Sequence, residues 1–472
     1  MTAAPTVQGS FDVCGPLPVG TTVLEASAGT GKTYTIAALA ARYVAEGHAR
    51  LDELMLVTFG RMATNELRQR VRDRLVGVER GLARALAGEP PQPHADEVEQ
   101  LLTAGRPEEL RARHHRIARS LSDFDTATIA TTHEFCLRML DELGILGDRE
   151  PDVVFVEHLS ELTREVVADV YLRRYAAAEQ LPPLSYDEAQ RIALQAVDDL
   201  DTRLVPAHPS VAAAEPTSGG WGSSGPVGAA GVALERVAFV HEVRAEVRRR
   251  KDLGRLFTYD DMLTRLRDAL ADPVLGAAAA GRLRQRYRMV LVDEFQDTDP
   301  VQWDILRRAF HRHATLVLIG DPKQAIYAFR GADVFSYLDA VTDADHTSTL
   351  ATNYRSDQPL VAALGTLMGG AALGHDRIVV KPVTASWPER RLSRVTGPPS
   401  PHPTLPDPTT PPDTTADLTA PVRIRIFPHD ADAERMPTVG RLRPKIVDDL
   451  VADVTAVLGS DLRLDLDGRS RP

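Results

Sequence analysis

The chain has 472 residues, of which 43% are hydrophobic and 26% are charged, and its net charge at pH 7 is −11. This length predicts two to four domains, and the hydrophobic content suffices for their cores. The sequence has no apolar run long enough to cross a membrane, no evident secretory signal, and two cysteines, Cys14 and Cys136, without a C-x-x-C pattern. Structural zinc, iron–sulfur clusters and a disulfide framework are therefore not expected, and we expect a cytoplasmic protein with no membrane partner.

The first predicted element is a strand–loop–helix unit near the N-terminus. Residues 22–24 are typical of a strand and residues 34–40 of a helix, and the loop between them is rich in small residues. Backbone N–H groups of such a loop can surround phosphates, and the start of the following helix favours negative charge. Lys32 would reach the outer phosphates and the Thr33 hydroxyl would bind Mg²⁺. The segment therefore predicts a nucleotide-binding P-loop, although Ala26 stands where the strict pattern has glycine.

Strand-like and helix-like segments alternate along the rest of the chain. Strands are predicted at residues 54–58, 129–132, 289–292 and 315–319. Helices are predicted from about residue 63, over 76–120 with a break at 88–91, at 134–143, over most of 155–255 and at 300–310. This alternation predicts an α/β fold, a RecA-like parallel sheet with helices on both faces and further helical insertions. A Gly/Ser/Ala-rich stretch at 218–231 and a Pro/Thr-rich stretch at 398–421 predict flexible or extended segments.

Two of the apolar strands are followed by polar residues of chemical interest. Asp293 and Glu294 come directly after the strand at 289–292, and Gln324 follows the strand at 315–319. In open parallel sheets the ligand lies at the carboxyl ends of the strands, which is also the edge that carries the P-loop. Asp293 is therefore a candidate for holding Mg²⁺, Glu294 for the general base, and Gln324 for a group that senses a γ-phosphate. An acidic loop without a catalytic role is the alternative for the carboxylates taken alone.

The loop that contains Gln324 also carries residues suited to unpaired bases. Tyr327 and Phe329 offer aromatic rings and Arg330 a planar guanidinium, and both kinds of surface stack on nucleobases. Taken in isolation, such aromatic residues are more often helix-packing residues. Clusters of arginine at 61–74, 244–255 and 282–288 permit a local phosphate-binding track in an otherwise acidic protein, although each cluster alone is better explained as a solvated helix face.

Several longer segments resemble the motifs of UvrD-type superfamily 1 DNA helicases. They occur in order between residues 20 and 357, and within that group the P-loop segment and motif Ia are most similar to the exodeoxyribonuclease V beta subunit (RecB) family. The matching segments are 25–35, 57–68, 131–136, 258–263, 292–302, 320–333 and 353–356. Long motifs in a fixed order are far more specific than the P-loop alone.

The resemblance implies a role for each matching residue. The implied ATP-binding residues are Glu25, Ala26, Ser27, Ala28, Gly29, Thr30, Gly31, Lys32, Thr33 and Tyr354. Thr33 and Asp293 would hold Mg²⁺, and the implied catalytic residues are Glu294, Gln324 and Arg355. The implied single-stranded DNA track consists of Phe59, His133, Tyr327, Phe329 and Arg330.

The resemblance also implies a division into domains. The ATP-binding domain 1A would comprise residues 1–75, 126–154 and 256–345, with helical insertions at 76–125 and 155–255, the latter being domain 1B. Residues 346–397 would begin a second RecA-like domain, 2A, followed by a linker at 398–421 and an incomplete 2A segment at 422–472.

The implied activity is that of an ATP-dependent 3′→5′ DNA helicase in double-strand-break repair and recombination, acting on single-stranded or duplex-end DNA. Expected partners are other exodeoxyribonuclease V subunits or a polypeptide that supplies motifs V and VI. Three departures stand out: Gly60-Arg61-Met62 in motif Ia, no adenine-reading glutamine before the P-loop, and no match to motifs V and VI or to a nuclease domain. We therefore expect that the chain alone does not unwind duplex DNA. Two alternatives stay open, a truncated or split ATP- and DNA-binding protein without motor activity and a P-loop ATPase that does not bind DNA.

Overall fold

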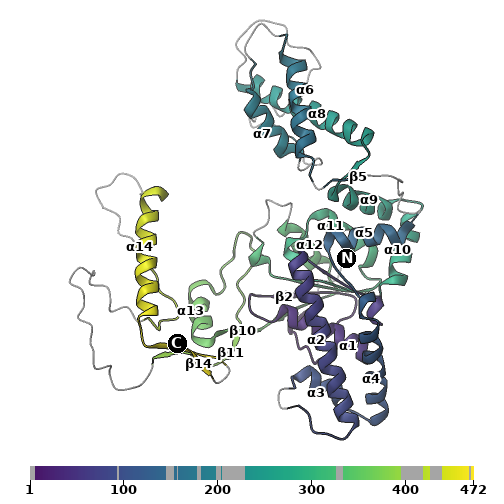
Figure 1. Cartoon of the computed structure of the whole chain (residues 1–472), viewed down its shortest axis with the longest axis vertical. Helices are drawn as coiled ribbons and strands as arrows, with labels where there is room; N and C mark the ends of the chain where they lie inside the picture. The colour runs from purple at the N-terminus through teal and green to yellow at the C-terminus, as the bar shows by residue number, and fades with distance from the viewer. Residues whose placement is uncertain are drawn as a thin grey trace, which may run out of the picture. The chain divides into compact units, whose positions relative to one another are not determined.

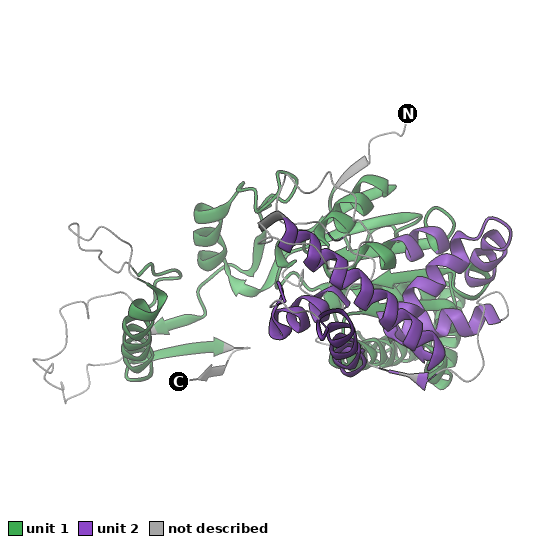
Figure 2. Ribbon diagram, turned by 90° about the horizontal axis from the view of Figure 1, so that it is seen from above, with its two compact units in different colours: residues 1–131, 284–303, 310–472 green, residues 132–283, 304–309 purple. Residues whose placement is uncertain are grey.

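The computed structural model describes residues 6–92, 95–144, 154–156, 158–177, 182–197, 204, 229–325, 333–394, 418–425, 438–466 and 469–471. The chain divides into two compact units (Figure 2). The sheet unit consists of Met1–Thr131, Arg284–Trp303 and Phe310–Pro472, and the helical unit of Thr132–Leu283 and Asp304–Ala309. The predicted flexible stretch at 218–231 and linker at 398–421 lie largely outside the described residues.

A seven-stranded parallel sheet forms the centre of the sheet unit (Figure 1). Its strands are β1 (Thr6–Ser10), β2 (Thr21–Ala26), β3 (Leu54–Thr58), β4 (Thr128–Thr131), β7 (Met289–Val292), β8 (Thr315–Gly320) and β9 (His346–Leu350). They lie in the order β1-β9-β2-β8-β7-β3-β4, and every neighbouring pair is parallel. This confirms the predicted α/β class with a parallel sheet.

The central strands form where the sequence has uninterrupted apolar runs. Every residue of β3 and β7 is buried, as expected for strands covered on both faces. Alternate residues of the central strands share one face of the sheet, for example Leu24 of β2, Leu56 of β3 and Leu291 of β7. They pack against α1 (Lys32–Glu46), α2 (Arg61–Leu86) and α4 (Pro107–Ser122). The sheet and these three helices thus enclose one hydrophobic core.

The strand β9 is not apparent from the sequence. Its residues His346-Thr347-Ser348-Thr349-Leu350 include a single strongly apolar side chain, yet it pairs with β2 on one side and β1 on the other. Ser348 and Leu350 are buried and their neighbours are half-buried. The sheet therefore extends to Leu350, beyond the boundary near residue 345 that the sequence predicts.

The helical unit contains a bundle of three helices, α6 (Ser160–Tyr175), α7 (Tyr186–Val197) and α8 (Ala229–Leu253). Phe239 of α8 is fully buried and stacks on Tyr175 of α6, with ring centroids 6.4 Å apart. Arg174 joins the same two helices, since it pairs with Glu235 at 2.7 Å and with Glu242 at 2.8 Å. Aromatic packing and this ion-pair cluster together hold the bundle.

The remaining elements are short or peripheral. The other helices are α3 (Glu97–Thr103), α5 (Thr132–Leu143), α9 (Tyr259–Ala271), α10 (Gly276–Arg286), α11 (Pro300–Phe310), α12 (Val334–Asp343), α13 (Gln358–Met368) and α14 (Val439–Leu458). The other strands are β5 (Val154–Phe155), β6 (Leu256–Phe257), β10 (Thr352–Asp357), β11 (Thr384–Trp387), β12 (Leu392–Arg394), β13 (Leu462–Leu466) and β14 (Arg469–Arg471). Within the described ranges, no helix combines the length and apolar character needed to span a membrane.

Candidate functional site

The candidate residues converge because their strands are parallel neighbours. The strands β2, β8 and β7 lie side by side, so the P-loop, the loop with Gln324 and the loop with Asp293 all leave the same edge of the sheet. β9 lies on the other side of β2 and leads directly into β10, which carries Tyr354 and Arg355. The sheet topology thus brings four separate sequence segments to one edge.

At two positions, the backbone of the P-loop has a conformation that only glycine adopts easily. Gly29 and Gly31 have φ values of 79° and 81°, in the left-handed region, and Gly31 is the residue that precedes the first turn of α1. Thr30 closes the loop, since its backbone N–H and its hydroxyl both donate to the Ser27 carbonyl, at 3.2 and 2.7 Å. Lys32 and Thr33 begin the helix and are partly buried. The loop is therefore shaped around the start of a helix, as anion binding requires.

Lys32 is joined to the carboxylate that follows β7. Its Nζ donates to Glu294 Oε2 at 2.5 Å, and the two side chains are 13% and 33% exposed. Asp293 is also partly buried, its backbone N–H donates to the Val57 carbonyl of β3 at 2.8 Å, and its Oδ1 accepts from the Glu294 N–H at 2.9 Å. Burial, and then the Glu294 charge, raises the pKa of Asp293 to about 6. One cation thus faces two adjacent carboxylates.

Glu294 is linked onward to the loop after β8. Its backbone is left-handed, with φ 51° and ψ 41°, an uncommon conformation for a residue with a side chain. Its Oε2 accepts from Gln296 Nε2 at 2.8 Å, and Gln296 Oε1 accepts from the Asp321 backbone N–H at 2.9 Å. Asp321 Oδ2 in turn accepts from Gln324 Nε2 at 2.7 Å. Hydrogen bonds therefore run continuously from Lys32 to Gln324.

Glu25 lies at the end of β2 among lysines. Its carboxylate pairs with Lys323 at 3.2 Å and with Lys381. Lys323 also pairs with Asp321, at 2.7 Å. The carboxylate of Glu25, which the resemblance assigns to ATP binding, is thus held by two ammonium groups.

The segment that begins with β10 lies directly on the P-loop. Asn353 Nδ2 donates to the Ala28 carbonyl at 3.0 Å, and the Tyr354 backbone N–H donates to the Gly29 carbonyl at 2.8 Å. The Tyr354 ring, 52% exposed, lies 3.6 Å from where a Cβ on Gly31 would be, and the Arg355 Cβ lies 2.8 Å from the corresponding point on Gly29. The structure therefore brings Tyr354 and Arg355 to the loop that contains Gly29 and Gly31.

The candidate DNA residues are placed less completely. Phe59 directly follows β3 and is half-buried. His133 lies in the first turn of α5, and its ring packs edge-on against Tyr259 of α9, with centroids 4.5 Å apart. Burial lowers the pKa of His133, which favours the neutral ring. Tyr327, Phe329 and Arg330 lie outside the described residues.

The sequence analysis assigned no role to four residues of this network, Gln296, Asp321, Lys323 and Asn353. Each stands one to three positions from a predicted site residue and inside a motif segment. Asp321 and Gln296 are 2% exposed, and Asn353 is 8% exposed. Their place inside the motif segments is the signal that could have identified them, and their burial requires them to have partners.

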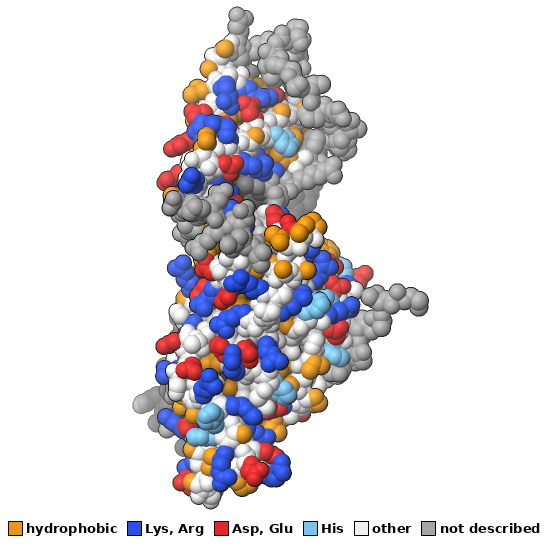
Figure 3. Space-filling view, turned by 90° about the vertical axis from the view of Figure 1, so that its right-hand side faces the viewer, with side chains coloured by type: hydrophobic (Ala, Val, Ile, Leu, Met, Phe, Trp, Pro, Cys, Tyr) orange, Lys and Arg blue, Asp and Glu red, His pale blue; other side chains and the backbone are white. Residues whose placement is uncertain are grey.

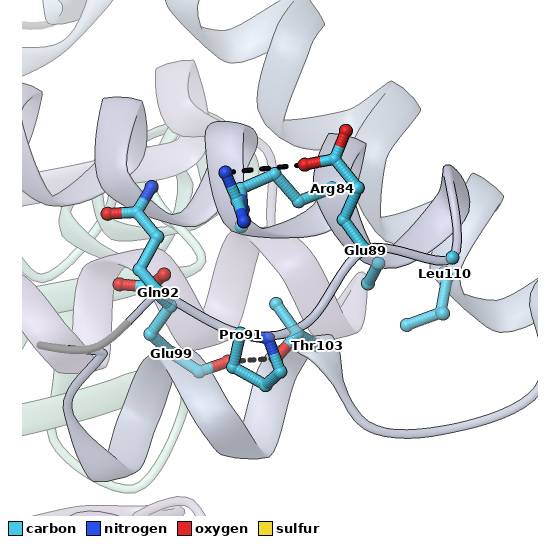
Figure 4. Close-up of a pocket in the computed structure, with 10 residues that line it drawn as sticks. Arg84, Glu89, Pro91, Gln92, Glu99, Thr103 and Leu110 are labelled. Carbon is cyan, nitrogen blue, oxygen red and sulfur yellow. Dashed lines mark hydrogen bonds and ion pairs between the residues drawn. The ribbon is translucent and has the colours of Figure 1, made fainter.

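A separate hollow lies away from this network, between the end of α2, the loop at 88–92, α3 and α4 (Figure 4). Arg84 and Glu89 pair across its rim at 3.3 Å, and Glu99 and Thr103 of α3 line the opposite side. None of its lining residues belongs to the P-loop or to the loops after β7 and β8. We assign it no role in the chemistry of the site.

Comparisons with known proteins agree with this geometry. The model of the UvrD/REP helicase N-terminal domain matches residues 14–345, which include the P-loop and the loops after β7 and β8. The chain is 43% identical over 455 residues to "RecBCD enzyme subunit RecB" of Mycobacterium tuberculosis H37Rv and 42% identical over 452 residues to that of Mycolicibacterium smegmatis, in both cases over 95% of this chain and 37% of the relative. The corresponding protein of Escherichia coli K12 is 29% identical over 463 residues, 74% of this chain and 38% of the relative.

The chain thus spans less than two fifths of the length of these curated relatives. The family model, in contrast, covers most of the chain and every strand of the central sheet except β1 and β9. The matched region includes the P-loop, the two adjacent carboxylates after β7 and the glutamine after β8, which lie at one edge of the sheet. The chain therefore belongs to the UvrD/REP helicase family.

Proposed function

We propose that this chain binds MgATP at the edge formed by β2, β7 and β8 and is the ATP-binding portion of an ATP-dependent 3′→5′ DNA helicase that acts in double-strand-break repair. The observation that carries the proposal is the continuous set of hydrogen bonds from Lys32 through Glu294 to Gln324. It joins a phosphate-binding loop to two carboxylates and to an amide, the groups that hydrolysis of a nucleoside triphosphate requires.

The P-loop would hold the triphosphate through its backbone. The left-handed Gly29 and Gly31 shape the loop before α1, and backbone N–H groups at the start of this helix would bind the phosphates. Lys32 would exchange its contact with Glu294 for the outer phosphates. This exchange would release the Glu294 carboxylate to accept a proton from the attacking water.

The residues around Asp293 fit a magnesium ion. Burial, and then the Glu294 charge, raises the pKa of its carboxylate, and a cation beside it would favour the ionised form. Among the described residues, no three or more metal-binding side chains gather into a cage, and Mg²⁺ typically takes one or two protein oxygens together with phosphates and water. Thr33 and Asp293 would hold the ion, which when bound neutralises charge on the β- and γ-phosphates.

Tyr354 and Arg355 would complete the nucleotide site. Tyr354 would stack on the adenine, for which its exposed ring beside Gly31 is suited, and Arg355 would contact the γ-phosphate. Both are held at the P-loop by Asn353, whose Oδ1 accepts from the Arg355 and Ser356 N–H groups at 2.9 and 2.8 Å. Nucleotide occupancy would therefore act directly on the segment that starts with β10.

Titration calorimetry with MgATP tests this site. Lys32→Ala should weaken binding by about tenfold or more, because it removes the charge that faces the phosphates. Lys445→Ala, at an exposed position on α14, is the matched control and should bind like the unaltered chain. Glu294→Gln should keep the affinity and lower any turnover. Equal nucleotide affinity for Lys32→Ala and the control would show that the site is wrongly assigned.

We propose that single-stranded DNA binds along Phe59, His133, Tyr327, Phe329 and Arg330. In the view of Figure 3, Lys and Arg side chains are spread over the face among Asp and Glu. We expect weak binding with a strong dependence on salt, because the proposed track combines an arginine with stacking aromatic rings. Fluorescence anisotropy with labelled oligonucleotides measures it. Phe329→Ala should lose about 1–3 kcal/mol of binding free energy if this ring stacks on a base. No binding at low salt would exclude the DNA track.

The names of the relatives denote a subunit of an enzyme with several subunits. We propose that this chain likewise associates with further subunits, or with a polypeptide that supplies motifs V and VI. To test this proposal, the chain would be co-expressed with such a polypeptide, and co-purification would be examined. DNA-stimulated ATP hydrolysis by the purified complex would then be measured.

A further inference from the structure

Gln296 is, like Asp321, a deeply buried polar link in the candidate site. It lies in the 3₁₀ turn Phe295–Asp297, where Phe295 enters the core and is fully buried. Because of this turn, the Gln296 side chain lies between the loops after β7 and β8, and 2% of the residue is exposed. A buried amide of this kind must satisfy both its donor and its acceptor.

The two ends of the amide have different partners. Nε2 donates to Glu294 Oε2 at 2.8 Å and lies 3.5 Å from Asp297 Oδ2, whereas Oε1 accepts from the Asp321 backbone N–H at 2.9 Å. The amide suits these two partners, because its nitrogen can only donate and its oxygen can only accept. The side chain therefore joins a carboxylate after β7 to the backbone after β8.

Gly320 packs closely against Gln296. A Cβ added to Gly320, at the end of β8, would lie 2.8 Å from Gln296 Oε1 and 3.1 Å from the Gln296 backbone nitrogen. The next residue, Asp321, holds Gln324 through its carboxylate. A displacement of Glu294 by a nucleotide would thus reach Gln324 through Gln296 and Asp321.

We propose that Gln296 is a positioning residue that fixes the Glu294 carboxylate and transmits the presence of a γ-phosphate from Glu294 to Gln324. This inference rests on the proposed function, since it assumes that a nucleotide binds at this edge. Gln296 itself need not touch the nucleotide. We expect a Gln296 variant to change the ratio of the affinities for a triphosphate and a diphosphate. A residue with a purely structural role would affect both affinities equally and leave this ratio unchanged.

The test compares binding of AMPPNP and ADP, both with Mg²⁺, by titration calorimetry. Gln296→Met preserves the approximate volume and removes both hydrogen bonds, and we expect it to reduce the preference for AMPPNP over ADP by about tenfold, with ADP affinity within about twofold. Gln358→Met is the matched control, because Gln358 Oε1 also accepts from a backbone N–H, that of Ala385, at 2.8 Å. The control should keep the preference.

A double-mutant cycle separates transmission from independent effects. If Gln296 acts on Gln324, the double variant Gln296→Met/Gln324→Ala should discriminate no worse than the poorer single variant. Gln296→Glu, which keeps the acceptor toward Asp321 and loses the donor toward Glu294, should also lower the preference, so the result does not depend on one variant that folds. Circular dichroism of each variant checks its fold.

The outcomes distinguish this inference from the proposed function. If Lys32→Ala weakens nucleotide binding but the Gln296 variants discriminate like Gln358→Met, or if the Gln296 and Gln324 effects multiply, the positioning role is wrong and the nucleotide site stands. If Lys32→Ala has no effect, the nucleotide site is wrong and the inference is overturned with it.

Discussion

The central sheet and the helix α14 place similar apolar side chains in opposite environments. Leu24, Leu56 and Leu291 in the sheet are at most 1% exposed, whereas Leu450 and Val451 on α14 are 59% and 58% exposed. No residue of α14 is buried. Both the sheet and α14 contain a regular pattern of apolar residues, but an element gains most of its stability when these residues are buried. The two regions should therefore respond very differently to the same substitution.

The largest difference is expected for truncation of leucine. Leu291→Ala in β7 should lower the free energy of unfolding by about 2–5 kcal/mol, because it leaves a cavity between the sheet and its helices. Leu450→Ala on α14 removes the same atoms from an exposed position and should change it by less than about 0.5 kcal/mol. Urea unfolding followed by tryptophan fluorescence measures both. Similar losses for the two variants would contradict the comparison.

A smaller difference is expected when a methyl group is added to glycine. Gly320→Ala would bring a Cβ within 3.1 Å of the Gln296 backbone nitrogen and 3.3 Å of the Phe295 nitrogen, so the backbone must shift. We expect a loss of about 1–3 kcal/mol in the free energy of unfolding.

The control for this variant is Gly440→Ala in the first turn of α14, where a Cβ would meet nothing within 4 Å. It should be neutral or stabilise the chain by up to about 1 kcal/mol, since alanine loses less entropy in a helix than glycine. If Gly320→Ala is as stable as Gly440→Ala in the same assay, the tight contact between β8 and Gln296 does not exist.

The smallest effect on stability is expected from a charge on the exposed face of α14. Val451→Glu should leave the free energy of unfolding within about 0.5 kcal/mol and reduce concentration-dependent self-association, because exposed apolar patches promote contacts. Light scattering at several protein concentrations measures the association. Thr455→Glu adds the same charge at an exposed polar position and should reduce association less. Equal effects of the two variants would indicate that net charge alone is responsible.

The sequence predicted the elements whose stability comes from uninterrupted apolar runs. The strands β3, β7 and β8 occur where such runs were found, because strands buried on both faces need apolar residues throughout. The helix α11 occurs at residues 300–310, as predicted. β9 was missed because threonine, serine and histidine dominate it, and its pairing with β2 depends on tertiary structure. Lys32, Glu294 and Gln324 were candidates from their positions next to strands. The role of Gln296 depends on a 3₁₀ turn and on contact with a distant loop, neither of which local sequence specifies.

The order of strands in the sheet also affects how the chain can fold during synthesis. β2 is made early, but its neighbours β8 and β9 come from the second half of the described sheet, and the Thr21 N–H finds its acceptor, Asp345, 324 residues further along the chain. At usual translation rates that interval lasts on the order of tens of seconds. Until β8 and β9 have been made, β2 lacks both of its neighbouring strands, so this edge of the sheet is completed only late in synthesis.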